Sequence, residues 1–283
     1  MAAVELGRLG VWIGLPGIPE VTDDQLKEFA GQVEQAGYGA FWVGSAKADF
    51  APADPILAGT TRLAFATGIL NTWTERPDAV VAGYRRVQAD YPDRVIAGIG
   101  IGHPEREDNK QYAKPYASLV RYLDDVAEIP KEHLALAALG PKVLKLSAQR
   151  TAGAHPYFTT PEHTRQAREI LGQGVLLAPE QKVVLETDAA KARDIGRRTL
   201  GFYLRLVNYR NSFLRLGFTE ADFADGGSDR LVDATVAWGD AGTVAARIAQ
   251  HHQAGADHVA VQVLGADNPL PIAELREVSA ALA

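Results

Sequence analysis

The chain contains no cysteine in its 283 residues. This absence excludes disulfides, thiolate metal ligands and a cysteine nucleophile. The sequence also lacks any apolar run near the ~20 residues that a membrane span needs. Residues 1–5 lack the basic region and apolar core of a signal peptide. We therefore expect a cytoplasmic protein with no membrane partner.

An excess of positive charge is missing as well. The net charge is −6, whereas a nucleic-acid-binding protein would need a basic face. We therefore expect no nucleic-acid partner. Hydrophobic residues make up 47% and charged residues 23%, which is ordinary for a globular protein with a sizeable core.

Two sequence motifs, that of a nucleophilic serine and that of a metal site, are also absent. There is no Gly-x-Ser-x-Gly elbow, so acyl transfer has no support. Histidines and carboxylates do not occur at metal-ligand spacing, and we predict no metal site.

What is present is a regular alternation of apolar strands and amphipathic helices. Eight segments are predicted to be strands: residues 9–15, 40–44, 63–70, 95–102, 134–140, 153–158, 182–186 and 258–264. Eight such units in a chain of this length predict a (β/α)8 TIM barrel, formed as a single domain over residues 1–283. Residues 187–236 are left over and predict a helical insertion between strands 7 and 8. A doubly wound sheet uses the same alternation and is the competing fold.

In a barrel, chemistry belongs at the carboxyl ends of the strands. Glycines at 98–102 either let a flat ring lie against bare backbone or serve tight helix–strand packing. Gly140 and Pro141 either present backbone N–H groups to an anion or simply begin a helix. His103 and His155, just past two strands, either transfer protons near neutral pH or only form hydrogen bonds. The pair His251-His252 is predicted to be structural.

One further histidine, His163, stands at a predicted helix start. We expect it to lie at the surface or to cap that helix.

Several longer stretches resemble the luciferase-like flavin and deazaflavin oxidoreductases, and within them the actinobacterial subgroup presumed to use coenzyme F420. The resemblance covers nearly the whole chain. The stretches that carry it are residues 67–73, 93–103, 138–141, 150–157, 161–164 and 254–259.

The resemblance implies a set of site residues. It predicts a cis peptide bond between Gly68 and Ile69 behind the cofactor ring, backbone at Gly100 and Gly102 along that ring, and His155 beside the cofactor. Phosphate contacts are implied for Ala138, Leu139, Gly140 and Pro141. Asn71 and Trp73 are expected to shape the substrate side, with His103 as the residue that transfers a proton. Residues 103–114 and 154–160 are expected to border a channel for the cofactor tail, with Arg106, Lys110 and Lys114 facing its carboxylates.

The chain also departs from the family. Ser45 stands where relatives often carry an acidic residue or a histidine, and the basic residues that bind sugar phosphates have no clear match. We therefore predict an F420-dependent oxidoreductase that transfers a hydride to or from an unidentified small organic substrate. An FMN-dependent monooxygenase and a non-catalytic flavin-binding barrel are the alternatives. We also expect a homodimer.

Overall fold

Several helices begin where the sequence supplies a side-chain cap. The side chain of Thr22 accepts a hydrogen bond from the backbone N–H of Gln25, and the Gln25 side chain accepts one from the N–H of Thr22, so helix α1 (Asp23–Gln35) starts with a capping box. The side chains of Thr160, Asp188, Ser228 and Asp240 each accept one backbone N–H at the start of a later helix, without the reciprocal bond.

The computed structural model describes residues 3–15, 21–103, 105 and 114–283. Its strands are β1 Leu9–Ile13, β2 Ala40–Val43, β3 Ala64–Thr67, β4 Leu70–Asn71, β5 Val95–Gly100, β6 Leu134–Leu136, β7 Gly153–Ala154, β8 Leu176–Leu177, β9 Glu180–Val184, β10 Val236–Trp238 and β11 Val259–Val263. The remaining α-helices are α2 Ala53–Ala58, α3 Pro77–Asp90, α4 Pro115–Asp125, α5 Pro141–Arg150, α6 Pro161–Leu171, α7 Ala189–Tyr203, α8 Val207–Arg215, α9 Asp229–Thr235, α10 Ala241–Gln253 and α11 Ile272–Leu282, with 3-10 turns η2 Lys131–His133 and η3 Glu220–Gly226. Across these ranges no helix is both long and apolar enough to cross a bilayer.

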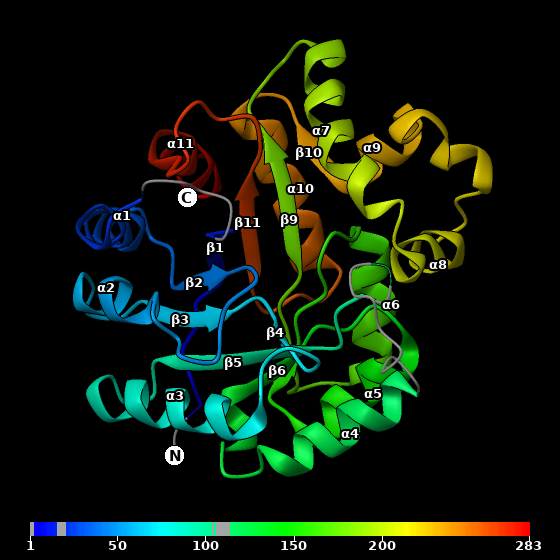
Figure 1. Ribbon diagram of the computed structural model, residues 1–283. Coiled ribbons are helices and arrows are strands. Elements are labelled where there is room, and N and C mark those ends of the chain that lie inside the picture. Colours follow the sequence, from blue (N-terminus) through cyan, green and yellow to red (C-terminus); the bar gives the residue numbers. More distant parts are fainter. Residues whose placement is uncertain (1–2, 16–20, 104, 106–113) are drawn as a thin grey trace.

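The strands form one curled parallel sheet with helices outside it (Figure 1). The path runs β10-β9-β11-β1-β2-β3-β5-β6-β7-β8, and β4 pairs with β5 beside it. Strand β8, at one end of the path, is followed after two residues by β9, which lies next to the other end. Ala178 and Glu180 donate backbone hydrogen bonds to Ala154 and Pro156 on one side, while Pro179 accepts one from Ala260 on the other. The predicted α/β alternation is thus confirmed as a curled parallel sheet.

Small residues line the inside of this curl and leave room for one indole. Ala40, Ala66 and Ala260 are fully buried there around Trp42. The indole stacks on His155 with ring centroids 4.0 Å apart. Its Nε1 donates to Nε2 of His258 at 3.0 Å, so the other nitrogen of His258 carries the proton and donates to the carbonyl of Gly7.

The structure corrects two of the predicted strands and one predicted helical segment. The predicted strand 63–70 breaks at Gly68 and Ile69 into β3 and β4, because β4 pairs with β5 alone. The predicted strand 182–186 begins at Glu180 and is preceded by β8, which was missed. The end of the predicted helical segment 187–236 is wrong, since Val236 begins β10 beside β9. Each missed strand has two or three residues, too few for a periodic pattern.

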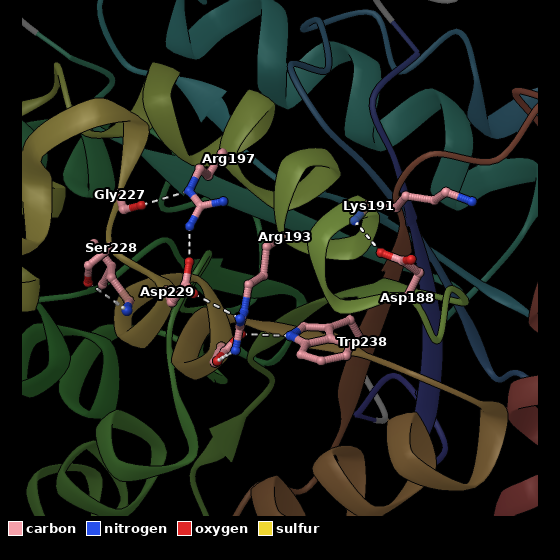
Figure 2. A network of polar contacts seen from close by, with 10 residues as sticks. Asp188, Lys191, Arg193, Arg197, Gly227, Ser228, Asp229 and Trp238 are labelled. Carbon is pink, nitrogen blue, oxygen red and sulfur yellow. Dashed lines mark hydrogen bonds and ion pairs between the residues drawn. The ribbon is translucent and has the colours of Figure 1, made fainter.

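Helices α7, α8 and α9 occupy the segment between β9 and β10 and gather on one side of the molecule (Figure 1). A polar network joins α7 to α9 (Figure 2). Arg193 forms two parallel hydrogen bonds with Asp233, at 2.9 and 2.7 Å, and a third with Asp229. Arg197 also pairs with Asp229, and the indole N–H of Trp238 donates to Asp233 at 2.7 Å.

The buried histidines couple stability to pH. Burial lowers the pKa of His155 and His251 to about 3 and that of His258 to about 4. In the unfolded chain the pKa of a histidine is about 6.5. Below that pH the unfolded state binds more protons than the folded state, so the free energy of unfolding falls by up to about 1.4 kcal/mol per histidine per pH unit.

Urea unfolding between pH 8 and 4 should show this loss of stability below about pH 6.5. In His155→Phe, which retains an aromatic ring beside Trp42, the slope with pH should be reduced by the share of one histidine. A slope identical to that of the wild type would show that His155 does not stay neutral in the folded state.

Arg193→Met should loosen α7 from α9. We expect the free energy of unfolding to drop by about 1 kcal/mol, because these ion pairs are only partly buried, and limited proteolysis to cut faster within residues 203–228. Arg198→Met is the matched control, since Arg198 lies on the same helix and its pair with Asp194 is exposed at both ends. Equal cleavage rates in the two variants would contradict a special role for Arg193.

Candidate functional site

A cavity of about 630 Å³ opens at the carboxyl ends of β3, β5 and β6, beneath α7 and α8. Its size is that of a small-molecule site. Three groups of residues line it: backbone-rich loops after the strands, the N-terminal end of α5, and aromatic and polar side chains of α7 and α8.

One wall of the cavity is backbone with few side chains. A Cβ added at Gly68 would lie 2.9 Å from Nε1 of Trp12, and one at Gly100 would lie 3.2 Å from Cβ of Ala137. The Trp12 ring itself packs over Gly44, where a Cβ would lie only 2.2 Å from it. The glycines therefore allow Trp12 to reach the floor of the cavity and leave a flat surface beside it.

The indole Nε1 of Trp12 is buried, and no described residue accepts a hydrogen bond from it. Trp12 lines the cavity. A buried donor without a partner is costly, so a ligand acceptor at this place would stabilise the site.

The N-terminal end of α5 forms a second wall. Gly140 is the N-cap, and Pro141 is in the first turn. Nη2 of Arg215 lies 3.3 Å from the carbonyl oxygen of Leu139 and 4.0 Å from the position of a Cβ on Gly140. Burial lowers the pKa of Arg215, but a guanidinium stays charged at neutral pH. A cation and the positive end of a helix dipole thus face one place, as anion binding requires.

His163 contributes to the same corner. Its Nε2 lies 2.9 Å from the carbonyl oxygen of Leu139, and its side chain is buried. The expectation that His163 lies at the surface is therefore wrong, because α6 packs against α5 and encloses the ring. The backbone N–H of His163 is the one that Thr160 caps.

An ion pair orders the loop after β2. Nζ of Lys47 lies 3.0 Å from Oε1 of Glu75, and the backbone N–H of Ala48 donates to Oε2 at 2.9 Å. Burial raises the pKa of Glu75, but the hydrogen bonds from Ala48 and Lys47 outweigh it and leave that pKa lowered. Glu75 is therefore ionised at neutral pH and neutralises Lys47 at the rim.

Aromatic rings form the side of the cavity opposite the loops. Tyr157 follows β7, Phe202 and Tyr203 end α7, and Tyr209 lies on α8. Tyr203 contacts Tyr157 at 5.5 Å and Tyr209 at 4.8 Å between ring centroids, and Tyr209 lies 5.6 Å from His103. Burial raises the pKa of Tyr157 and of Tyr209 well above the ordinary value, so both phenols stay protonated.

A fully buried ion pair lies under this aromatic cluster. Nζ of Lys182 is 3.0 and 3.1 Å from the two carboxylate oxygens of Glu180, and neither side chain is exposed. The ammonium lies 3.7 Å from the ring centroid of Tyr157 and 4.1 Å from that of Phe158. Burial lowers the pKa of Lys182 to about 8 and raises that of Glu180, while each charge opposes the shift of the other. Phe158 also donates its backbone N–H to Glu180 at 2.9 Å.

The structure brings most of the predicted site residues together. Those that line the cavity are Gly68, Ile69, Asn71, Gly100, Gly102, His103, Ala138, Leu139 and Gly140. Trp73 and Pro141 do not line it. His155 lies outside it too, buried against Trp42 with Nδ1 2.6 Å from the carbonyl oxygen of Ala178. Of the predicted channel residues, Arg106 and Lys110 lie outside the described residues, and Lys114 is exposed before α4.

The predicted cis peptide between Gly68 and Ile69 is wrong, because every peptide bond in the described residues is trans. Gly68 continues the parallel ladder, since its N–H donates to the carbonyl of Val43 at 2.7 Å.

Sequence reasoning missed the residues that the insertion contributes. Asn208, Asn211 and Arg215 recur at three- and four-residue spacing along α8 and face the cavity. That polar stripe was visible in the sequence, but nothing local indicated that α8 lies across the mouth of the sheet. Lys182 and Glu180 gave no signal of burial either, because the charged residues of strands are usually exposed.

A second hollow of about 530 Å³ lies between β10 and α10. Its Asp233 and Arg247 already have partners: Asp233 accepts from Arg193 and Trp238, and Arg247 donates to the carbonyls of Asp233 and Ala234. It therefore offers less to a ligand than the first cavity. In the part of the chain that the structure describes, no cluster of histidines and carboxylates could hold a metal ion.

No protein-family model and no curated protein matches the sequence. Solved structures do match the fold. An F420-dependent secondary alcohol dehydrogenase, in complex with an F420-acetone adduct, has a TM-score of 0.75 at 16% identity, covering 99% of this chain and 100% of its own. The coenzyme F420-dependent tetrahydromethanopterin reductase from Methanopyrus kandleri has a TM-score of 0.73 at 14% identity, covering 99% and 100%.

A flavin enzyme matches as well. The oxygenating constituent of 3,6-diketocamphane monooxygenase from Pseudomonas putida, a type II Baeyer–Villiger monooxygenase in complex with FMN, has a TM-score of 0.72 at 13% identity, covering 98% of this chain and 99% of its own. The fold predicted from the resemblance is thus the fold of F420-dependent and FMN-binding oxidoreductases.

Proposed function

We propose that the chain is an oxidoreductase that transfers a hydride between a bound deazaflavin of the F420 type and a small organic substrate. The observation that carries this proposal is the cavity in which a glycine-lined wall, the Trp12 donor and the anion-favouring end of α5 meet. A tricyclic ring with a phosphate-bearing chain can use all three: the flat wall for the ring, the donor for a ring acceptor and the end of α5 for the phosphate.

We also propose that the curled sheet is a closed (β/α)8 barrel formed by one domain. The hydrogen bonds of residues 178–180 to both neighbouring segments support closure. The segment containing β8 and β9 would then count as one strand, with α7 to α9 as the insertion after it.

The described residues fit the cofactor in a definite way. Backbone at Gly68 and Gly100 would lie along the ring, and Trp12 would donate to one of its polar atoms. The end of α5 and Arg215 would bind the phosphate. The deazaflavin, when bound, supplies the hydride chemistry. Lys47, with Glu75, keeps the loop after β2 in place, and the aromatic residues of α7 exclude water.

FMN is the alternative cofactor, since it shares the ring, the ribityl chain and the first phosphate. The same wall and the same cation would serve it, and oxygen chemistry would replace simple hydride transfer. The resemblance to the F420 subgroup favours the deazaflavin. We therefore expect fluorescence titration to give a lower Kd for F420 than for FMN. Purification with stoichiometric FMN bound, or a reversed order of affinities, would favour the monooxygenase.

Arg215→Ala should weaken binding of both cofactors by roughly tenfold, because it removes a partly buried charge from the phosphate position. The control is Lys145→Ala, an exposed cation on α5 that does not line the cavity. Fluorescence titration measures both Kd values. Wild-type affinity in Arg215→Ala, or an equal loss in the control, would place the phosphate elsewhere.

His103→Ala should slow turnover while leaving the cofactor Kd nearly unchanged. General acid–base catalysis contributes roughly 10²–10⁴-fold, and His103 lines the cavity beside Tyr209. Cofactor-dependent turnover of a panel of alcohols, aldehydes and ketones gives the rate. Full activity would remove His103 from the mechanism, and cofactor binding without turnover of any substrate would favour the non-catalytic alternative.

The homodimer and the cytoplasmic location remain predictions. Size-exclusion chromatography with light scattering would test the former.

A further inference from the structure

Two tyrosine hydroxyls and one amide form a chain at the edge of the cavity. The hydroxyl of Tyr203 donates to that of Tyr157 at 3.1 Å, and the hydroxyl of Tyr157 donates to Oε1 of Gln262 at 2.9 Å. Tyr203 and Tyr157 line the cavity, whereas Gln262 lies on β11 behind them.

Trp12 and Lys182 hold the Tyr157 end of this hydrogen-bond chain in place. The Tyr157 ring contacts Trp12, at 4.8 Å between centroids, and the Lys182 ammonium, at 3.7 Å from its centroid. Lys182 is in turn fixed by both carboxylate oxygens of Glu180. A cation on the face of a ring and an indole beside it restrict the ring's rotation. The hydroxyl of Tyr157 therefore points in one direction.

The direction of donation along this chain is reversible. A phenol hydrogen rotates about its C–O bond, and a carboxamide carries both an acceptor oxygen and a donor nitrogen that exchange places when the amide flips. With Gln262 accepting, Tyr203 donates inward. With the amide turned, Gln262 donates to Tyr157, Tyr157 donates to Tyr203, and the Tyr203 hydrogen is directed to the cavity.

Such a hydrogen-bond chain suits a substrate oxygen that changes between a hydroxyl and a carbonyl group. A hydroxyl group both donates and accepts, whereas a carbonyl only accepts. Lys182 is paired with Glu180 and Lys47 with Glu75, and the proposed cofactor phosphate would pair with Arg215, so no net charge is left for the substrate. The neighbouring surfaces of Phe202 and Tyr209 are aromatic, which favours a flat apolar body.

We propose that Tyr203, Tyr157 and Gln262 form the substrate-oxygen site, and that the substrate is an uncharged flat molecule whose oxygen interconverts between hydroxyl and carbonyl. This inference rests on the proposed redox function and names its substrate class. Tyr203 contacts the oxygen. Tyr157 and Gln262 are positioning residues, and the Lys182–Glu180 pair supports Tyr157.

The test uses three probes of equal shape: 1-phenylethanol, acetophenone and ethylbenzene. Each is titrated by ligand-observed NMR into the purified full-length protein, with and without saturating cofactor. The alcohol and the ketone should each bind roughly two- to tenfold more tightly than the hydrocarbon, the gain of one net hydrogen bond. The Kd values of the alcohol and the ketone should differ from each other by no more than about tenfold, because the hydrogen-bond chain can accept from the one and donate to the other.

Tyr203→Phe should reduce the affinity for both oxygenated probes to that for ethylbenzene while leaving ethylbenzene unchanged. Tyr157→Phe should reduce the same difference in part, since it removes the relay and keeps the ring. Tyr38→Phe is the matched control, because Tyr38 is a buried tyrosine away from the cavity whose hydroxyl bonds to the carbonyl of Leu275. Its probe affinities should equal those of the wild type.

Three results would overturn the inference: equal affinities for all three probes, an unchanged oxygen preference in Tyr203→Phe, or a far stronger preference for one of the two redox states. None of them is the failure of the proposed function. That failure is read from the cofactor titration, in which neither F420 nor FMN would bind.

Discussion

The buried pair between Lys182 and Glu180 is the contact on which the cavity depends. Burial of two charges is expensive, and the cost is offset here by two short N–O contacts, the N–H of Phe158 and two aromatic faces. Removing one partner would leave an uncompensated charge, so the pair is stable only when complete. It holds the segment after β7 against β9, and that segment carries Tyr157 to the aromatic side of the cavity.

Tyr157 in turn contacts two other parts of the cavity wall. On one side the ring packs against Trp12, which reaches the glycine wall because Gly44 and Gly68 have no side chain. On the other side Tyr157 binds Tyr203 at the end of α7. The insertion is thereby joined to the sheet, and the ion pairs of Arg193 keep α7 aligned with α9. Aromatic packing, a buried ion pair and a surface network thus determine one cavity together.

Much of the site could be predicted from local sequence. Gly68, Gly100, Gly102 and His103 lie at or just after the ends of apolar strands, and the carboxyl ends of parallel strands meet at one edge of a sheet. Gly140 and Pro141 signalled a helix start that could favour an anion. His155 obeyed the same rule and yet lies in the interior, because the alanines around Trp42 leave space for a second ring there. Position after a strand does not say which way a side chain points.

By itself, the sequence determined the alternation of strands and helices, the capped helix starts and the strand-end loops that carry glycine and histidine. Those features depend on residues within a few positions of one another, where periodicity and capping act. Only the tertiary structure decided that α8 covers the mouth, that Lys182 is buried beneath Tyr157, and that Arg215 meets the end of α5. Each of these contacts joins residues that are not neighbours in the chain, apart from the Glu180–Lys182 pair, whose burial depends on distant rings. Long-range packing therefore determined the part of the site that α7, α8 and the buried ion pair form.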